Sequence, residues 1–500
     1  MNIPRTSMYK ALVAVCVTAA IAACTKNNPP TPPPPPGPDT TDIPTPEGDR
    51  DELYRPQIHY TPLKNWMNDP NGMVYVDGVY HLFYQYNPRS NDWGNMSWGH
   101  ASSPDMLTWT ELPVALTRDD LGDIFSGSAV IDKENTAGFG ANAMVAIYTS
   151  ADGIQQQSVA YSLDGGKSFT RYSGNPVIRN NDDNLRDPKV FWHEPTHQWI
   201  MALAKGWVKG VEFYSSPDLK SWTHKSTFYV DLAGRPSLQW ECPDLIQLDG
   251  KWVLIVSVNP GGPVLGSGTM YFIGDFDGTT FTADDLEYPL WLDYGMDNYA
   301  GVTWSNTGDR KLLIGWMNNW QYAGAVPCSP WRSAMTLPRE LHLLNYEGKN
   351  ILANTVVSEI EGIAEEWKEV GDVIEATDAY QLRITLPLDH NSTITLSNQD
   401  NEKYVMDIYA SSRELSAKRN AATGQTSFNG FFSVPAMRAP LNTEGDSVTL
   451  DIFVDQSSVE IFTLNGSMAM TNLVFPKEMY NQLSISGVNG TAKVRALKIK

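Results

Sequence analysis

A short turn, Ser103-Pro104-Asp105-Met106-Leu107-Thr108-Trp109, recurs in varied form three more times along this chain of 500 residues. The later copies are Ser162-Leu163-Asp164-Gly165-Gly166-Lys167-Ser168-Phe169, Ser216-Pro217-Asp218-Leu219-Lys220-Ser221-Trp222 and Gly274-Asp275-Phe276-Asp277-Gly278-Thr279-Thr280-Phe281. The aligned aspartates are separated by 59, 54 and 59 residues. A repeat of roughly 50 to 60 residues that is made of short strands is typical of a four-stranded propeller blade.

A second series of residues interleaves with these turns at the same period. Each member opens an apolar strand, and the steps between members are 58, 60, 54 and 58 residues: Asp69, Gly127, Asp187, Glu241 and Tyr299. A chance recurrence of common turn residues is the alternative, but it does not explain why the two series agree. We therefore predict a five-bladed β-propeller over residues 53–352.

The rest of the chain, residues 353–500, also reads as strands. Ser447–Asp455 and Ser458–Phe462 alternate between apolar and polar residues, which predicts two packed antiparallel sheets. Only Thr355–Trp367 shows a helical pattern, and we expect a short connecting helix there. The predicted fold class is all-β, with the propeller followed by a C-terminal β-sandwich.

The N-terminus reads as a targeting segment. Arg5 and Lys10 precede an apolar stretch of 13 residues, Ala11–Ala23, which is too short to span a bilayer as a helix. It ends in Ile21-Ala22-Ala23-Cys24, which resembles a bacterial lipobox. Residues 1–24 are therefore expected to be a signal peptide, with Cys24 becoming lipidated; an ordinary secretory signal is the alternative. The Pro-rich residues 25–52 are expected to form an extended tether.

Composition narrows the class of ligand. The net charge of −20 disfavours nucleic acid and polyanions, and 16 Trp and 22 Tyr suit the binding of neutral sugars. No Cys/His spacing predicts a metal site, and we expect neither metal nor cofactor. After the signal and Cys24, only Cys242 and Cys328 remain; whether they pair is open, and Cys242 is expected to be an inert buried thiol.

Three carboxylates in the second series are candidates for chemistry: Asp69, Asp187 and Glu241. The first strand of each propeller blade lines the central channel, so residues at the starts of these strands meet at one end of it. Carboxylates that are held close together separate one another's pKa values, as a glycosidase requires of its nucleophile and its acid. The structural alternative is that each acid only caps a turn or forms an ion pair.

Six motifs resemble glycoside hydrolase family 32, the family of invertases, inulinases and levanases. In chain order they are Trp66-Met67-Asn68-Asp69-Pro70-Asn71-Gly72, Gln85-Tyr86-Asn87-Pro88, Trp98-Gly99-His100, Phe125-Ser126-Gly127-Ser128, Arg186-Asp187-Pro188 and Glu241-Cys242-Pro243. The resemblance covers residues 54 to about 340, and more loosely the C-terminal part. It implies a five-bladed propeller with a sandwich, and retaining hydrolysis of β-fructofuranosides without a metal.

The resemblance also implies roles for individual residues. Asp69 matches the nucleophile, Glu241 the general acid/base and Asp187 the acid that stabilises the transition state. Asp297 is expected to orient the acid/base at the substrate site, and Trp320, in preference to Trp316, to add an aromatic wall. The remaining expected substrate-binding residues are Asn68, Gln85, Trp93, Phe125, Ser126 and Arg186.

The expected function is hydrolysis of levan or inulin by a lipoprotein on the bacterial outer membrane, facing the cell surface. The tether and lipid favour a polymer, and levan, over sucrose; endo and exo action both stay open. The alternatives are transfructosylation, a propeller glycosidase for arabinan or xylan, and a non-catalytic fructan-binding lipoprotein. The binding protein would lack one of the three acids, whereas all three are present.

Overall fold

The computed structural model describes residues 43, 48–179, 184–230, 232, 239–376 and 378–499. The predicted signal peptide, its lipidated Cys24 and most of the predicted tether lie outside these residues. Residues 43–500 form one compact unit. Within the described part no helix is long and apolar enough to cross a membrane.

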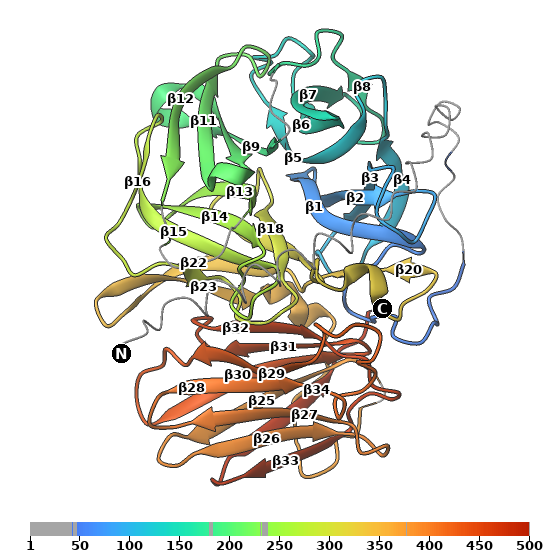
Figure 1. The fold of residues 1–500 in the computed structure, drawn as a ribbon, viewed down its shortest axis with the longest axis vertical. Helices are drawn as coiled ribbons and strands as arrows, with labels where there is room; N and C mark the ends of the chain where they lie inside the picture. The colour runs from blue at the N-terminus through green and yellow to red at the C-terminus, as the bar shows by residue number, and fades with distance from the viewer. Residues whose placement is uncertain are drawn as a thin grey trace, which may run out of the picture. The chain divides into compact units, whose positions relative to one another are not determined.

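Five antiparallel sheets follow one another up to Val356 (Figure 1). The first holds β1 (Asn65–Val76), β2 (Val79–Asn87), β3 (Ser97–Ser103) and β4 (Thr110–Leu116), with the short parallel β20 (Trp331–Arg332) beside β1. The second holds β5 (Asp123–Asp132), β6 (Ala143–Asp152), β7 (Ile154–Ser162) and β8 (Thr170–Arg171), and the third β9 (Leu185–His193), β10 (Gln198–Lys205), β11 (Gly210–Ser216) and β12 (Thr223–Tyr229).

The fourth sheet holds β13 (Gln239–Leu248), β14 (Lys251–Asn259), β15 (Gly268–Phe276), β16 (Phe281–Ala283) and β17 (Leu290–Trp291). The fifth holds β18 (Tyr299–Thr303), β19 (Leu312–Met317), β21 (Ala334–Met335), β22 (Arg339–Tyr346) and β23 (Lys349–Val356). The innermost strands β1, β5, β9, β13 and β18 each contact the next, and β18 contacts β1. They lie around the centre of the propeller (Figure 1).

The propeller architecture is thus present. The number of blades stays a prediction, because short strands such as β20 join sheets across the boundaries between repeats. The hairpin turn at Asp77-Gly78 is confirmed: both residues have positive φ, 52° and 82°, as a type I′ turn requires.

The repeated aspartate of the turn motif has a structural role in each copy. Oδ1 of Asp105 accepts the backbone N–H groups of Leu107 and Thr108, at 2.9 and 2.6 Å. Asp218 and Asp277 accept the two equivalent N–H groups of their own turns. The motif is therefore an Asx-type turn that ends the third strand of a blade.

The C-terminal residues form a sandwich of two sheets. One has the order β24 (Lys368–Glu369), β34 (Thr491–Ala496), β25 (Tyr380–Pro387), β30 (Ser447–Asp455), β31 (Ser458–Thr463) and β32 (Ala469–Leu473). The other has the order β29 (Val434–Pro440), β28 (Glu414–Arg419), β27 (Lys403–Tyr409), β26 (Ser392–Ser397) and β33 (Gln482–Ser486). Alternating residues such as Leu382, Ile394 and Ile452 are fully buried in the core between them.

One expectation needs correction. The connecting helix predicted over Thr355–Trp367 is only a 3-10 turn, η5 (Ser358–Gly362), because β23 continues through the β-branched Thr355 and Val356. The predicted domain boundary at 352/353 lies within β23 and stays a prediction. The other described helices are also short 3-10 turns: η2 (Glu194–Thr196), η3 (Gly206–Val208) and η4 (Ala323–Ala325).

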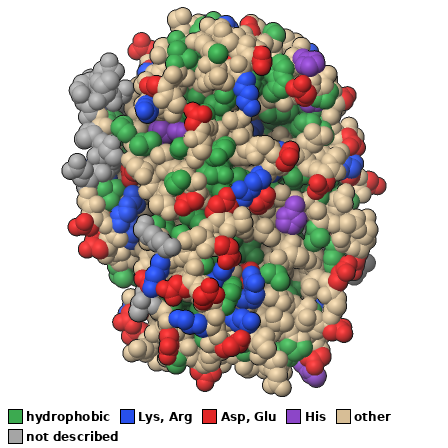
Figure 2. Space-filling model, turned by 180° about the vertical axis from the view of Figure 1, so that it is seen from behind, with side chains coloured by type: hydrophobic (Ala, Val, Ile, Leu, Met, Phe, Trp, Pro, Cys, Tyr) green, Lys and Arg blue, Asp and Glu red, His purple; other side chains and the backbone are tan. Residues whose placement is uncertain are grey.

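Charged side chains of both signs are dispersed over one face of the molecule. Figure 2 shows Asp and Glu intermixed with Lys and Arg on the face that it presents. The net charge of −20 is therefore not gathered into one acidic region on that face. On the face drawn there, the described side chains form no basic stripe of the kind that binds nucleic acid.

Candidate active site

The pairing of each innermost strand with its neighbour has a register shift at or next to its residue of the second series. The register shifts between Met67 and Pro70 in β1, between Ile124 and Gly127 in β5, and between Glu241 and Asp244 in β13, and similar shifts occur in β9 and β18. A β-bulge leaves one residue unpaired and redirects the neighbouring side chains. Pro70, Pro188 and Pro243 follow the three acids here, where a missing N–H costs no ladder bond.

The carboxylate of Asp69 is held by two donors. Ser126 Oγ donates to its Oδ2 at 2.7 Å, and Asn68 Nδ2 donates to its Oδ1 at 3.1 Å. Asn68 is fixed in turn by Trp66 Nε1, 2.7 Å from its Oδ1. Burial raises the pKa of Asp69, and these hydrogen bonds oppose that rise. Asp69 is still partly exposed, so a ligand can reach it.

Asp187 lies beside Asp69 across a single thiol. Cys242 Sγ is 3.6 Å from Oδ2 of Asp69 and 3.6 Å from Oδ2 of Asp187. The backbone N–H of Cys242 also donates to Asp187 Oδ2 at 3.0 Å. Asp187 adopts φ 62°, in the left-handed region, so backbone strain is stored where this carboxyl enters the channel.

Glu241 is held from two sides. Arg186 donates to its Oε1 from Nη2 at 2.8 Å and from Nε at 3.2 Å. Tyr299 donates its hydroxyl to the other oxygen, Oε2. Burial, together with the neighbouring Glu241, raises the pKa of Tyr299 well above its usual value, so this hydroxyl keeps its proton. The Glu241 side chain is 19% exposed.

Burial raises the pKa of Asp187 to about 7, and the nearby Glu241 and Asp69 add to the rise although Arg186 opposes it. The separation of pKa values was expected between the nucleophile and the acid. The large shift falls instead on Asp187, the most deeply buried of the three acids, with 6% exposure. The three predicted acids therefore do converge on one site.

Aromatic rings border the site. Trp320 is half-buried and stacks on Trp66, with centroids 5.9 Å apart, while Trp316 behind them is fully buried. Trp93 is 51% exposed and meets Phe125 edge-on at 6.2 Å. Of the two candidates for an aromatic wall, Trp320 has the accessible ring. Gln85 is buried and donates to the carbonyl of Ile124, next to Phe125.

Asp297 does not lie at the site as expected. It is fully buried, and Arg419 and the backbone N–H of Leu473 both donate to its Oδ2, at 2.5 and 2.8 Å. Its Oδ1 accepts the hydroxyl of Tyr322 at 2.5 Å. The side chain therefore joins the propeller to sandwich strands β28 and β32, and neither oxygen is free for a sugar.

Sequence reasoning missed two contributors to the site. Tyr299 was placed in the inner-strand series, yet its position at the start of β18 was not used as a signal that it faces the acids. Cys242 was expected to be inert; it is a buried, free thiol with a pKa raised well above its usual value by burial, but it bridges two carboxylates. Cys328 is also free, so the two do not pair.

A cavity of about 710 Å³ in the described structure is not lined by any of the three acids. Beneath the acids there is a space of only about 20 Å³, lined by Asp187, Lys189 and Cys242 among others. Within the described residues, no cluster of three or more His, Cys, Asp or Glu could hold a metal ion. Three carboxyl groups at one end of a propeller channel are the equipment of a glycoside hydrolase.

Comparisons with known proteins agree with this class. Residues 59–355 match the glycosyl hydrolases family 32 N-terminal domain, and residues 352–500 match the C-terminal domain of the same family. The chain belongs to glycosyl hydrolase family 32.

Two relatives and one solved structure show the extent of the likeness. A levanase of Bacillus subtilis is 44% identical over 480 residues, which cover 90% of this chain and 70% of that protein. An extracellular exo-inulinase of Aspergillus niger is 38% identical over 496 residues, which cover 85% and 90%. The crystal structure of an exo-inulinase from Aspergillus awamori superimposes with a TM-score of 0.83 at 34% identity, over 90% of this chain and 99% of that one.

Proposed function

We propose that this protein hydrolyses β-fructofuranosidic bonds in fructans, with retention of configuration. The observation that carries the proposal is the convergence of Asp69, Asp187 and Glu241 around Cys242 and Arg186. The similarity to a levanase and to exo-inulinases supports the substrate class.

In the proposed mechanism Asp69 attacks the anomeric carbon of the terminal fructosyl unit. Ser126 and Asn68 keep this carboxylate oriented, and their hydrogen bonds favour its ionised form. Glu241 protonates the leaving oxygen and then takes a proton from the water that hydrolyses the fructosyl-enzyme. Arg186 and Tyr299 hold Glu241 in place through both of its oxygens.

The proposed role of Asp187 is to bind fructose hydroxyls as positive charge develops in the transition state. Asn68, Gln85, Trp93, Phe125, Ser126, Arg186 and Trp320 form the proposed surroundings of the same sugar. Asp69 and Glu241 are partly exposed, as the two groups that react with the substrate must be. Asp187 is buried, which suits its supporting role.

The proposed polymer is levan, with inulin as the second candidate. The Bacillus relative is named a levanase and the Aspergillus relatives are named exo-inulinases. Both modes of action, cleavage from the chain end and cleavage within the chain, stay open for this protein.

We also propose an extracytoplasmic location, with Cys24 lipidated at the outer membrane and residues 25–52 as a tether. The names of the exo-inulinase relatives, which include the word extracellular, support the location in its coarser form.

Product analysis tests this proposal. The full mature chain is incubated with levan, inulin and sucrose, and the products are separated by size. Free fructose alone indicates exo action, and a ladder of oligomers indicates endo action. Release from none of the three substrates would overturn the assignment of substrate.

The matched variants are Glu241→Ala and Glu414→Ala, the second on the sandwich, where Glu414 is paired with Arg438. Loss of the general acid/base should lower kcat by about 10²- to 10⁴-fold while substrate binding is largely kept. The Glu414 variant should keep full activity. Unchanged turnover in Glu241→Ala would reject the mechanism.

A further inference from the structure

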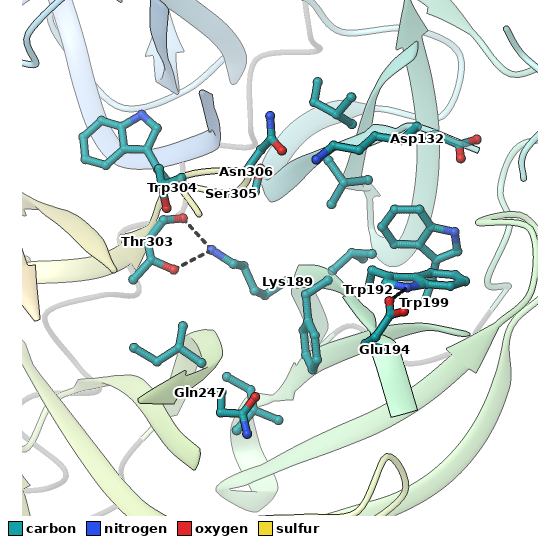
Figure 3. Close-up of a pocket in the computed structure, with 18 of the residues that line it drawn as sticks. Asp132, Lys189, Trp192, Glu194, Trp199, Gln247, Thr303, Trp304, Ser305 and Asn306 are labelled. Atoms are coloured by element: carbon teal, nitrogen blue, oxygen red, sulfur yellow. Dashed lines mark hydrogen bonds between the residues drawn. The ribbon is translucent and has the colours of Figure 1, made fainter. Parts of the chain in front are cut away.

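A cavity of about 710 Å³ lies at the far ends of the innermost strands (Figure 3). Its walls come from the end of β5, the end of β9 and the loop after it, the end of β13, and the residues that follow β18. This volume is within the range of small-molecule sites. Asp187 and Glu241 lie near the opposite ends of β9 and β13, and Asp69 lies on β1, which does not line the cavity.

The cavity is separate from the catalytic site. Asp187 and Trp192 are five positions apart along β9, or about 16 Å at the rise of a β-strand. Lys189 closes the channel between them. Its Nζ donates to the carbonyl and hydroxyl of Thr303 at 2.5 and 3.1 Å (Figure 3), and to Asp244 Oδ2 at 3.0 Å. The space above Lys189, about 20 Å³, holds about one water molecule.

Indole rings form the apolar part of the cavity wall. Trp192 is half-buried, and its Nε1 donates to Glu194 Oε2 at 2.7 Å, which fixes the ring against Trp199 at a centroid distance of 5.2 Å. Trp252 is also half-buried and packs on Phe191 at 5.5 Å. The rings are therefore held in fixed orientations before any ligand arrives.

The charged groups that remain for a ligand in the lining balance. Asp132 is buried and its carboxylate accepts the N–H groups of Thr136 and Ala137, and Lys189 is paired with Asp244. This leaves Glu134 and Glu194 with Lys133 and Lys311. The exposed side chains of Gln247, Asn306 and His197 add neutral hydrogen-bonding groups. Balanced charge favours neither an anion nor a cation. Fixed indole rings beside amides and carboxylates suit the C–H faces and hydroxyls of a neutral sugar.

We propose that this cavity is a second, non-catalytic binding site for a neutral oligosaccharide, namely a segment of the fructan on which the enzyme acts. The identity of the sugar rests on the proposed function. A site on the opposite side of the propeller would hold a second stretch of polymer and raise the local concentration of substrate.

Calorimetric titration tests the proposal. Fructo-oligosaccharides of four units, β-2,6- or β-2,1-linked, are titrated into the Glu241→Gln chain, in which turnover is suppressed. Two equivalents of sugar should bind. In the same background, Trp192→Ala and Gln247→Trp should each abolish one equivalent, the first by removing a ring and the second by filling the cavity.

Trp367→Ala is the control, because it removes a half-buried tryptophan that packs on Arg495 in the sandwich; it should leave two equivalents. Melting curves identify any variant that fails to fold. Because Gln247 is exposed, we expect Gln247→Trp to fold. A single equivalent in Glu241→Gln that Trp192→Ala and Gln247→Trp leave unchanged, or two equivalents retained in a folded Gln247→Trp chain, would overturn the proposal. If the proposed function alone were wrong, Glu241→Gln would bind a single equivalent, and Trp192→Ala and Gln247→Trp would each abolish it.

Discussion

Asp187 is the residue at which function and stability oppose one another. It is buried beside Asp69, with its backbone in the left-handed region and its pKa raised to about 7, mainly by burial. For stability alone, a buried carboxyl group at this position is unfavourable. The cost is tolerated because Cys242 N–H and Arg186 partly satisfy the group and because the proposed chemistry requires it there.

Asp187→Asn should therefore abolish turnover and stabilise the fold in a pH-dependent way. The folded pKa lies above the ordinary value of 3.8, so wild-type stability falls as pH rises from about 4 through about 7, whereas the amide stays neutral. The melting temperature of the variant should exceed that of wild type by about a few degrees at pH 8 and match it near pH 4. An equal difference at both pH values would contradict this account.

At the scale of elements, the bulges decide where the acids point. The sequence predicted their positions well, since the five strand starts in the second series coincide with the five bulged strands. It did not predict their contacts, because a bulge turns a side chain by an amount that spacing does not encode. Gly127 is one such point: its N–H donates to Asn71 Oδ1 at 3.1 Å and links β5 to β1.

Gly127→Ala tests the role of the bulge in β5. A Cβ there would lie 2.1 Å from the carbonyl oxygen of Ile147, so the backbone must shift, and Ser126 would move away from Asp69. We expect a loss of about 1–3 kcal/mol in the free energy of unfolding, together with a fall in kcat/KM. The control is Gly371→Ala, which meets nothing within 4 Å. The idea fails if the two variants melt and turn over alike.

At the scale of the whole molecule, buried ions join the propeller to the sandwich. His59 lies between Asp455 and Glu460, with its ring nitrogens 2.7 and 2.8 Å from their oxygens. Arg339 donates to the other oxygen of Glu460 at 2.7 Å. Burial lowers the pKa of His59, but hydrogen bonds to the two carboxylates outweigh it and raise the pKa to about 9.

The folded pKa of His59 exceeds its ordinary value of 6.5, so its stabilisation is complete below about pH 6.5 and disappears as pH rises through 9. His59→Gln should lose about 3 kcal/mol at pH 6, as expected when one partner of a buried ion pair is removed, and should show a flatter stability profile between pH 6.5 and 9. Denaturant unfolding at several pH values measures both effects. His390→Gln, at an exposed site, should behave as wild type; a parallel profile for His59→Gln would refute the assignment.

Strand alternation, turn chemistry and repeat spacing are local properties of the chain, so the sequence alone predicted the all-β class, the repeat period and the three carboxylates that meet at one site. Three other features are visible only in the folded chain: the contact of Tyr299 with Glu241, the thiol of Cys242 between Asp69 and Asp187, and the place of Asp297 at the sandwich. These partners come from different sheets, and their contacts depend on how far each bulge turns and how closely neighbouring sheets pack.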